Sequence, residues 1–487
     1  MATDTRRADT GGTPDTAPDH LADWSAVRLA DAVAAREVSA VEVMRAHLER
    51  IEERNPRLQA VVSQQPDSVS LAAAEAADRR TAEARAAGDP LPPLHGLPTA
   101  VKDLMDVAGF PTTNGSAAFA DARAVERDSV LATLLRDAGA IIVGKTNTPE
   151  MGQGVLTFNP VFGTTVNPWD TSRHAGGSSG GAGAALAARM LPIADGSDSG
   201  GSLRYPAAFC NVVGVRPSPG RVPSGRTGNA WTPHGVTGPM ARDSADAARF
   251  LQALAVEKTV WPMSAMPRHA VTPVELDGLR IAWSDDAGGL PIDPAVRAVH
   301  RAFAEQLAGL GAVVEADEPD FAGADEAWET IETFEFFLGG RHGVDGGAQG
   351  FRPDYVRNVE QGRATTATQL ADAYERRTRM YRDTAAVLDR HDVLVLPATP
   401  VVAPPAEVEW VDEVDGHRFE RYFTWQMLAN RLTLTAHPVV VTSAGFTPEG
   451  LPVGVQVVGR YGREEQLLAV TRAIEEATGW IRRAPAL

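Results

Sequence analysis

Residues 176–204 read GGSSGGAGAALAARMLPIADGSDSGGSLR and contain two glycine-rich segments. The first, GGSSGG at 176–181, is too rich in glycine for the interior of a helix or strand, so it predicts a loop whose backbone closely approaches another part of the chain. A helix is expected to begin at Ala182. The second segment offers consecutive backbone N–H groups around a serine, the arrangement of an oxyanion hole, at Ser199, Gly200, Gly201 and Ser202. Ser202 is therefore the preferred candidate nucleophile.

The first segment also matches G-x-S-x-G at Gly176 to Gly180, the pattern of the α/β-hydrolase nucleophile elbow. An elbow needs a hydrophobic strand directly before it, whereas residues 167–174 contain Pro168 and several strongly polar side chains. The loop interpretation is preferred, and a Ser-His-Asp esterase built on Ser178 is the alternative. The residues directly before the following helix contain no G-K-[ST] sequence and no expected strand, so a nucleotide site is not predicted there.

A third segment, GLPTAVKD at 96–103, places Lys102 directly after an apolar run. Of the 46 basic residues only three are lysines, Lys102, Lys145 and Lys258. Arginine is always protonated, whereas a buried lysine can lose its proton, so a lysine retained against this bias is a candidate base. Such a lysine must ionise near pH 7 instead of about 10.4, which burial favours and the adjacent carboxylate of Asp103 opposes. A salt-bridged lysine is the alternative for an isolated residue.

Outside these segments, helical and strand patterns alternate. A capping box at Ser39 to Glu42 opens a helix that is expected to end near Asn55 and Pro56. Strands are expected over 99–101, 140–143, 279–283, 312–314 and 392–396, and helices over 70–87, 129–137, 293–310 and most of 320–385. This alternation predicts an α/β protein with a layered sheet. No repeat or long linker interrupts the pattern, so one domain is expected over 21–487, after a disordered tail over 1–20.

The composition excludes several classes of partner. The 46 basic and 63 acidic residues leave a net charge of -17, which repels phosphate backbones and anionic lipid, so neither nucleic acid nor a membrane is an expected partner. No apolar run approaches the ~18 residues of a membrane helix. The single cysteine, Cys210, excludes an internal disulfide and fits a reducing, cytoplasmic location. No spaced set of Cys, His and carboxylate ligands predicts a metal.

Together the three segments resemble the amidase signature family, whose pattern is a GxPxxVKD lysine, a GGSSGG loop and a D-[TS]-GGS-[IVL]-R nucleophile segment. All three occur in this order, with 178 − 102 = 76 residues from lysine to loop serine and 202 − 178 = 24 to the second serine. The resemblance implies a single αβα-layered domain in which helices flank a central mixed, mostly parallel twisted sheet. Its motif core would lie in 94–245, and the variable region 320–440 would shape the pocket.

The resemblance also implies roles for residues. Ser202 would attack an amide carbonyl, Ser178 would accept its proton and pass it to neutral Lys102, and water would then hydrolyse the acyl-enzyme. A cis peptide is implied at Gly177-Ser178, with Ser179, Asp198 and Arg204 supporting the loop and the nucleophile. A small amide and water would be the substrates, and esters or carbamates would be side substrates. The resemblance implies that no cofactor is needed. It also implies a homodimer, because relatives are commonly homodimers.

Two segments depart from the family pattern. Where the family has L-K-P-T, this chain has Val215-Arg216-Pro217-Ser218. Where relatives have N-x-[TS]-G-x-P-A, residues 431–439 differ and contain His437. A structural role is preferred for His437 over a position in the pocket wall. The alternatives are a glutamyl-tRNA amidotransferase A-like subunit that works with partner chains and a non-catalytic scaffold. The substrate would be set by 120–165, 225–240, 320–380 and 405–440, which the sequence does not place in space.

Overall fold

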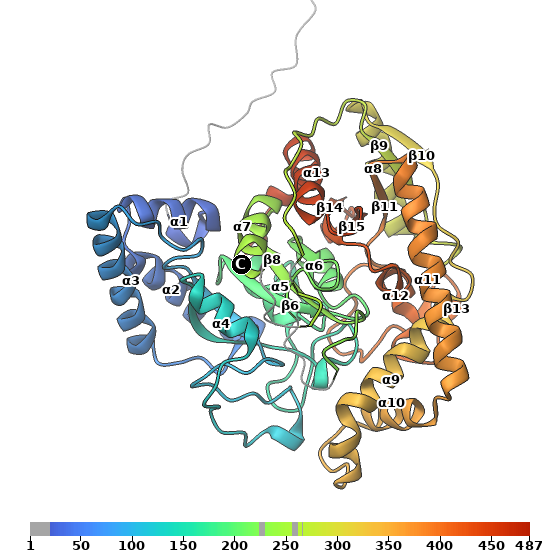
Figure 1. Cartoon of the computed structure of the whole chain (residues 1–487), viewed down its shortest axis with the longest axis horizontal. Coiled ribbons are helices and arrows are strands. Elements are labelled where there is room, and N and C mark those ends of the chain that lie inside the picture. Colours follow the sequence, from blue (N-terminus) through green and yellow to red (C-terminus); the bar gives the residue numbers. More distant parts are fainter. Residues whose placement is uncertain (1–19, 224–228, 256–261, 265) are drawn as a thin grey trace, which may run out of the picture.

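An eight-stranded mixed sheet forms the centre of the computed structural model, which describes residues 20–223, 229–255, 262–264 and 266–487 (Figure 1). Its strands are ordered β10-β9-β11-β15-β14-β7-β8-β6. Their bounds are β6 Ile193–Asp198, β7 Val213–Arg216, β8 Val236–Ala241, β9 Arg280–Trp283, β10 Val313–Ala316, β11 Val393–Pro397, β14 Val439–Phe446 and β15 Pro452–Val458. The layered α/β architecture with a mixed sheet is confirmed.

The pairing within this sheet corrects one detail of the expectation. Only β10 with β9 and β9 with β11 pair in parallel, and the other five neighbouring pairs are antiparallel. The sheet is therefore mixed but not mostly parallel. The reason is visible at β14 and β15, which are joined by a turn over 447–451, because a turn this short joins antiparallel strands, whereas parallel strands need a crossover.

A second, three-stranded sheet carries the candidate lysine. Its order is β1-β3-β2, with bounds β1 Val61–Val62, β2 Pro98–Lys102 and β3 Ile141–Thr146. Side chains link β2 to the edge strand β6 of the large sheet: Thr99 Oγ1 donates to the Ile193 carbonyl at 3.1 Å, and the Lys102 N–H donates to Asp195 Oδ1 at 3.1 Å. The last residue of β2 is thereby held against the middle of β6.

Helices cover both faces of the large sheet. Along β11, Val393 and Val395 belong to the hydrophobic core that includes α8 and α13, whereas Leu394 and Leu396 belong to the core that includes α11 and α12, because successive strand residues point to opposite faces. The helices are α1 Ala26–Ala35, α2 Ala40–Leu58, α3 Asp67–Ala87, α4 Val130–Asp137, α5 Gly180–Ala187, α6 Arg204–Cys210, α7 Ser244–Leu254, α8 Pro294–Gly309, α9 Ala324–Asp345, α10 Pro353–Ala364, α11 Ala367–Arg390, α12 Met427–Thr435 and α13 Glu464–Thr478. Helices α1 to α3 and α9 to α11 lie at opposite ends of the long axis (Figure 1).

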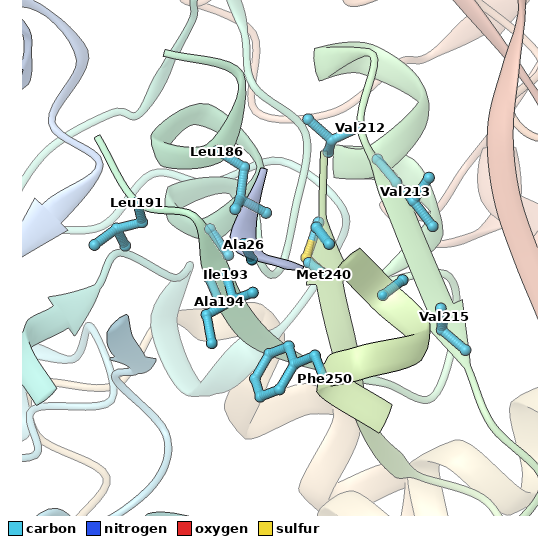
Figure 2. Close-up of a cluster of buried hydrophobic side chains, with 14 of the residues drawn as sticks. Ala26, Leu186, Leu191, Ile193, Ala194, Val212, Val213, Val215, Met240 and Phe250 are labelled. Atoms are coloured by element: carbon cyan, nitrogen blue, oxygen red, sulfur yellow. The ribbon is translucent and has the colours of Figure 1, made fainter. Parts of the chain in front are cut away.

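The core beneath the glycine-rich segments consists mainly of aliphatic side chains. Figure 2 shows Leu186 of α5, Ile193 of β6, Val213 of β7, Met240 of β8 and Phe250 of α7 gathered in one buried cluster. Each of these side chains is fully buried. Within residues 176–204, both α5 and β6 thus pack on the same core, which fixes the loop before α5 relative to the turn after β6.

Most local predictions match the structure within a few residues. The capping box at Ser39 is present, although α2 continues through Pro56 to Leu58, and α5 begins at Gly180 instead of Ala182. Residues Asp170–His174 form a short strand, β5, that pairs with β4, Val166–Asn167, in a hairpin separate from the large sheet. It is not the hydrophobic central strand that an elbow requires.

The N-terminal part of the chain is only partly described by the structure. Of the tail expected over 1–20, all but His20 lies outside the described residues. The described helices include none long and apolar enough to cross a membrane.

Candidate active site

The loop before α5 holds Ser178 in a tightly packed setting. The Gly177-Ser178 peptide is cis, as the resemblance implied. A Cβ on Gly177 would lie 2.9 Å from the backbone of Val155 and Leu156, so only glycine fits there. Ser179 N–H donates to the carbonyl of Ser202 at 3.1 Å, which joins this loop directly to the second glycine-rich segment.

Lys102 lies at the centre of a cluster of serine hydroxyls. Its Nζ is 2.7 Å from Ser178 Oγ, 2.9 Å from Ser179 Oγ and 3.1 Å from Ser197 Oγ. The lysine side chain is fully buried at the end of β2. A lysine in contact with a hydroxyl in this way can receive that hydroxyl's proton if the amine is neutral. The structure thus brings together Lys102 and Ser178, which are 76 residues apart in sequence.

Asp103, the carboxylate that follows Lys102, pairs with a different lysine. Lys145 Nζ of β3 lies 3.3 Å from Asp103 Oδ1 and also donates to the Met105 carbonyl at 2.7 Å. Burial raises the pKa of Asp103 and lowers the pKa of Lys145, and the opposite charge of each partner opposes these shifts. Lys145 is therefore the salt-bridged, structural lysine of this region.

The turn that carries Ser202 is held by Asp198, the last residue of β6. The Asp198 carboxylate accepts the N–H of Gly201 and of Leu203, each at 3.0 Å, and Arg204 Nη2 at 2.8 Å. Arg216 also contacts this carboxylate, at 3.4 Å. Burial raises the pKa of Asp198, but the charges of Arg204 and Arg216 lower it further, so its pKa lies well below the usual range. The Asp198 carboxylate thus joins Gly201, Leu203 and Arg204 around the turn that carries Ser202.

Helix α9 holds the other side of the same turn. Trp328 is buried in α9, and its Nε1 donates to the carbonyl of Ser199 at 2.9 Å. A Cβ on Gly200 would lie 2.8 Å from both Trp328 Cζ2 and Asn430 Oδ1. The turn therefore fits closely between its own strand and two helices from the C-terminal half of the chain.

A cavity of about 450 Å³ opens onto both serines. Ser202 is 8% exposed, Ser178 2% and Lys102 0%, so of the three only the candidate nucleophile retains appreciable access to the cavity. The other walls combine apolar side chains with carboxylates, among them Leu104, Met151, Phe336, Leu338, Tyr355, Asp106, Glu332 and Glu335. A larger cavity of about 730 Å³, lined by Thr272, Asp277 and Arg460, has none of the candidate residues in its wall.

The structure adds residues that the sequence did not indicate. Ser197 and Asp195 of β6 both contact Lys102, and Trp328 contacts the nucleophile turn. Leu104 to Asn114 also contribute to the cavity wall, whereas its described lining includes no residue from 405–440. Asp195 and Ser197 occupy alternate positions of the buried strand β6, which leads into the turn that carries Ser202. Two polar side chains on one face of a buried strand are the sequence signal that could have identified them as site residues.

His437 lies away from the cavity. Its ring stacks on Tyr381 with centroids 4.9 Å apart, and its Nδ1 lies 2.9 Å from the Thr435 carbonyl. Burial lowers its pKa to about 4, so it is a neutral, structural histidine at neutral pH. Among the described residues no group of three or more His, Cys, Asp and Glu is arranged to hold a metal ion.

Known proteins share this architecture over nearly their whole length. A family model described as Amidase matches residues 42–468. The acylamidase of Rhodococcus erythropolis is 32% identical over 476 residues, which covers 95% of this chain and 97% of that protein. The A-type subunit of the glutamyl-tRNA(Gln) amidotransferase of Salinispora tropica is 34% identical over 499 residues, with 94% and 98% covered. The crystal structure of a bacterial aryl acylamidase of the amidase signature family matches with a TM-score of 0.85 at 27% identity, covering 94% of this chain and 97% of that one. The chain therefore belongs to the amidase signature family of hydrolases.

Proposed function

We propose that the protein hydrolyses a carboxylic amide through an acyl-enzyme formed on Ser202. The observation that carries this proposal is the 2.7 Å contact between Lys102 Nζ and Ser178 Oγ, beside a cavity that Ser178 and Ser202 both line. A serine nucleophile needs a neighbouring base, and Lys102, which contacts Ser178, can act as that base through the Ser178 hydroxyl. The similarity to an acylamidase supports amides as the substrate class.

In the proposed reaction, Ser202 Oγ attacks the carbonyl carbon while its proton passes to Ser178 Oγ and the proton of Ser178 passes to Lys102 Nζ. The C–N bond then breaks, and the proton returns along the same path to the leaving nitrogen. Water repeats the sequence on the acyl-enzyme and releases the carboxylic acid. Ser179 and Ser197 hold the lysine head in place because both accept hydrogen bonds from its Nζ.

The oxyanion would be held by backbone N–H groups of the nucleophile turn. The sequence indicates those of Ser199, Gly200, Gly201 and Ser202, but the Gly201 N–H already donates to Asp198. Within the described structure the other three have no assigned backbone or side-chain acceptor, so the proposal relies on Ser199, Gly200 and Ser202. Donors fixed in this way are worth about 3 kcal/mol each in acyl transfer.

A second candidate function is that of a glutamyl-tRNA amidotransferase A-like subunit, because the Salinispora tropica protein of that type is 34% identical. That function predicts a partner chain, whereas an independent amidase is active alone. Turnover of amides by the purified chain without added partner favours the first function. Dependence on a partner chain favours the second.

The test uses a panel of aliphatic, aromatic and peptide amides together with a fluorophosphonate probe, which labels an activated serine. We expect wild-type labelling and turnover, and loss of both in Ser202→Ala and Lys102→Met. Folded variants that keep full amide turnover would refute the assignment. An unlabelled, inactive but folded wild-type protein would favour the scaffold, and loss of activity on replacing a histidine would favour the esterase.

Some expectations stay predictions. The homodimer, the side activity on esters and carbamates, and the cytoplasmic location are among them.

A further inference from the structure

Asp195 is a buried carboxyl group next to Lys102, the lysine that the serine hydroxyls surround. It lies in the middle of β6, three residues before Asp198, and is 1% exposed. Its Oδ1 accepts the backbone N–H of Lys102 at 3.1 Å. A side chain therefore takes the place of a backbone acceptor between β2 and β6, and it fixes a carboxyl group next to the residue that carries the candidate base.

The charges around Asp195 come from two neighbouring strands. Lys102 at the end of β2 and Lys145 of β3 both interact with it electrostatically. Lys145 already has Asp103 as its ion-pair partner, at 3.3 Å. The neighbouring strand β8 and helix α5 contain no titratable residue. Helix α7 also packs on β6 and carries Asp246, which accepts two backbone N–H groups of α1, and Arg249, which pairs with Asp31. On β6 itself, Asp198 is bound to Arg204 and Arg216. Asp103 and Asp198 thus have ion-pair partners of their own, whereas Asp195 is the carboxyl group whose charge acts on Lys102.

Asp195 is poised between its two protonation states. Burial raises its pKa to about 6, while the Lys102 N–H and the charges of Lys102 and Lys145 hold that pKa down. While Lys102 is charged, the group is therefore mainly a carboxylate above about pH 6. A buried negative charge acts strongly on a nearby cation because little water screens it.

We propose that Asp195 is a positioning residue that stabilises the ammonium form of Lys102 while the lysine holds the proton taken from the serines. The inference rests on the proposed function. The step adds no new bond: the proton passes from Ser202 through Ser178 to Lys102, and Asp195 keeps its charge throughout. Before the step this buried region contains a carboxylate and a neutral amine, and after it a carboxylate and an ammonium, whose mutual attraction favours the transfer.

Asp195→Asn tests this role, because it retains an oxygen for the Lys102 N–H and removes only the charge. We expect kcat to fall about 10- to 100-fold with little change in KM, since Asp195 is not among the cavity-lining residues. The acidic limb of the pH profile should move down by about one pH unit, because Lys102 without a counter-charge loses its proton more easily. Unchanged kcat and an unchanged limb would overturn the proposal.

The matched control is Glu475→Gln, which also neutralises a fully buried carboxyl group with a raised pKa, in α13 among Ser244 and Thr442. The acidic limb of its pH profile should stay in place.

The wild-type enzyme supplies a test that needs no variant. If activity requires both a neutral Lys102 and an ionised Asp195, the slope of log kcat/KM against pH steepens from about one to about two below about pH 6. A slope that stays near one down to about pH 5 overturns the proposal.

Failure of this inference can be told apart from failure of the proposed function. If Ser202→Ala keeps amide turnover, the proposed function is wrong. If Ser202→Ala is inactive while Asp195→Asn keeps the wild-type limb, only the role of Asp195 is wrong.

Discussion

The Asp103 carboxylate lies 3.3 Å from the ammonium of Lys145, so the acidic neighbour of Lys102 in sequence neutralises another lysine. Both side chains are fully buried. Lys145→Met should lower the free energy of unfolding by about 3 to 5 kcal/mol, because it leaves Asp103 buried without its counter-charge. Urea unfolding measures this loss. The double variant Lys145→Met with Asp103→Leu should lose less than the sum of the single losses.

The control for that experiment is the exposed pair of Arg280 and Glu315, whose atoms lie 3.1 Å apart. Arg280→Met should lower the free energy of unfolding far less than Lys145→Met, because water screens exposed pairs. Equal losses at the buried and the exposed pair would contradict the explanation.

Lys102→Arg should be as inactive as Lys102→Met, with kcat reduced by about 10³-fold, because a guanidinium cannot become neutral and accept a proton. Steady-state kinetics on the best amide and fluorophosphonate labelling give the measurement, with circular dichroism to verify folding. If Lys102 only held the serines by its positive charge, arginine would retain more than a tenth of kcat. That result would remove the proton relay.

Trp328→Phe should lower kcat about 10-fold and the free energy of unfolding by about 1 to 3 kcal/mol, because it removes the hydrogen bond to Ser199 and some buried volume. Trp425→Phe is the matched control, since Trp425 is also buried and its Nε1 has no hydrogen-bond partner in the described part of the chain. The control should change stability without changing kcat. Equal kinetic effects would show that the Ser199 contact is unimportant.

Glu475→Gln should make stability less dependent on pH. Burial raises the pKa of Glu475 to about 7 from 4.5, so its contribution to stability is present below pH 4.5 and is lost as the pH rises through 7. The variant should therefore gain on the wild type as the pH rises from 4.5 through 7, by up to about 3 kcal/mol. Denaturant unfolding at several pH values measures this. The exposed carboxylate variant Glu476→Gln should show no such trend.

Local signals in the sequence were sufficient for many elements. Ser39 and Glu42 predicted the start of α2 because the capping box depends on residues three apart. Ser129 and Asp293, placed just before α4 and α8, cap them in the same short-range way. The direction of the strands was harder to predict than their positions, because it depends on the connection between β14 and β15 and on the strands with which each of them pairs. The expectation of a mostly parallel sheet failed at that level.

The site itself was predicted only through joint motifs. Lys102, Ser178 and Ser202 come from three separate segments, and their order and spacing carried the inference. Asp195 and Trp328 were not indicated, because each reaches the site from a strand or helix whose packing the sequence does not reveal. The partner of Asp103 was missed for the same reason: adjacency in sequence suggests Lys102, whereas β3 places Lys145 beside it.

The contact between Trp328 and Ser199 has a practical consequence for redesign of this enzyme. Helix α9 contributes Glu332 and Phe336 to the cavity wall, and its Trp328 also donates a hydrogen bond to the Ser199 carbonyl in the turn that carries Ser202. Exchanging this helix with that of a relative to change substrate preference would therefore also disturb the position of Ser202. Grafts that keep Trp328 and vary only the residues one and two turns further along the helix would separate selectivity from turnover, and they are the natural units for a library.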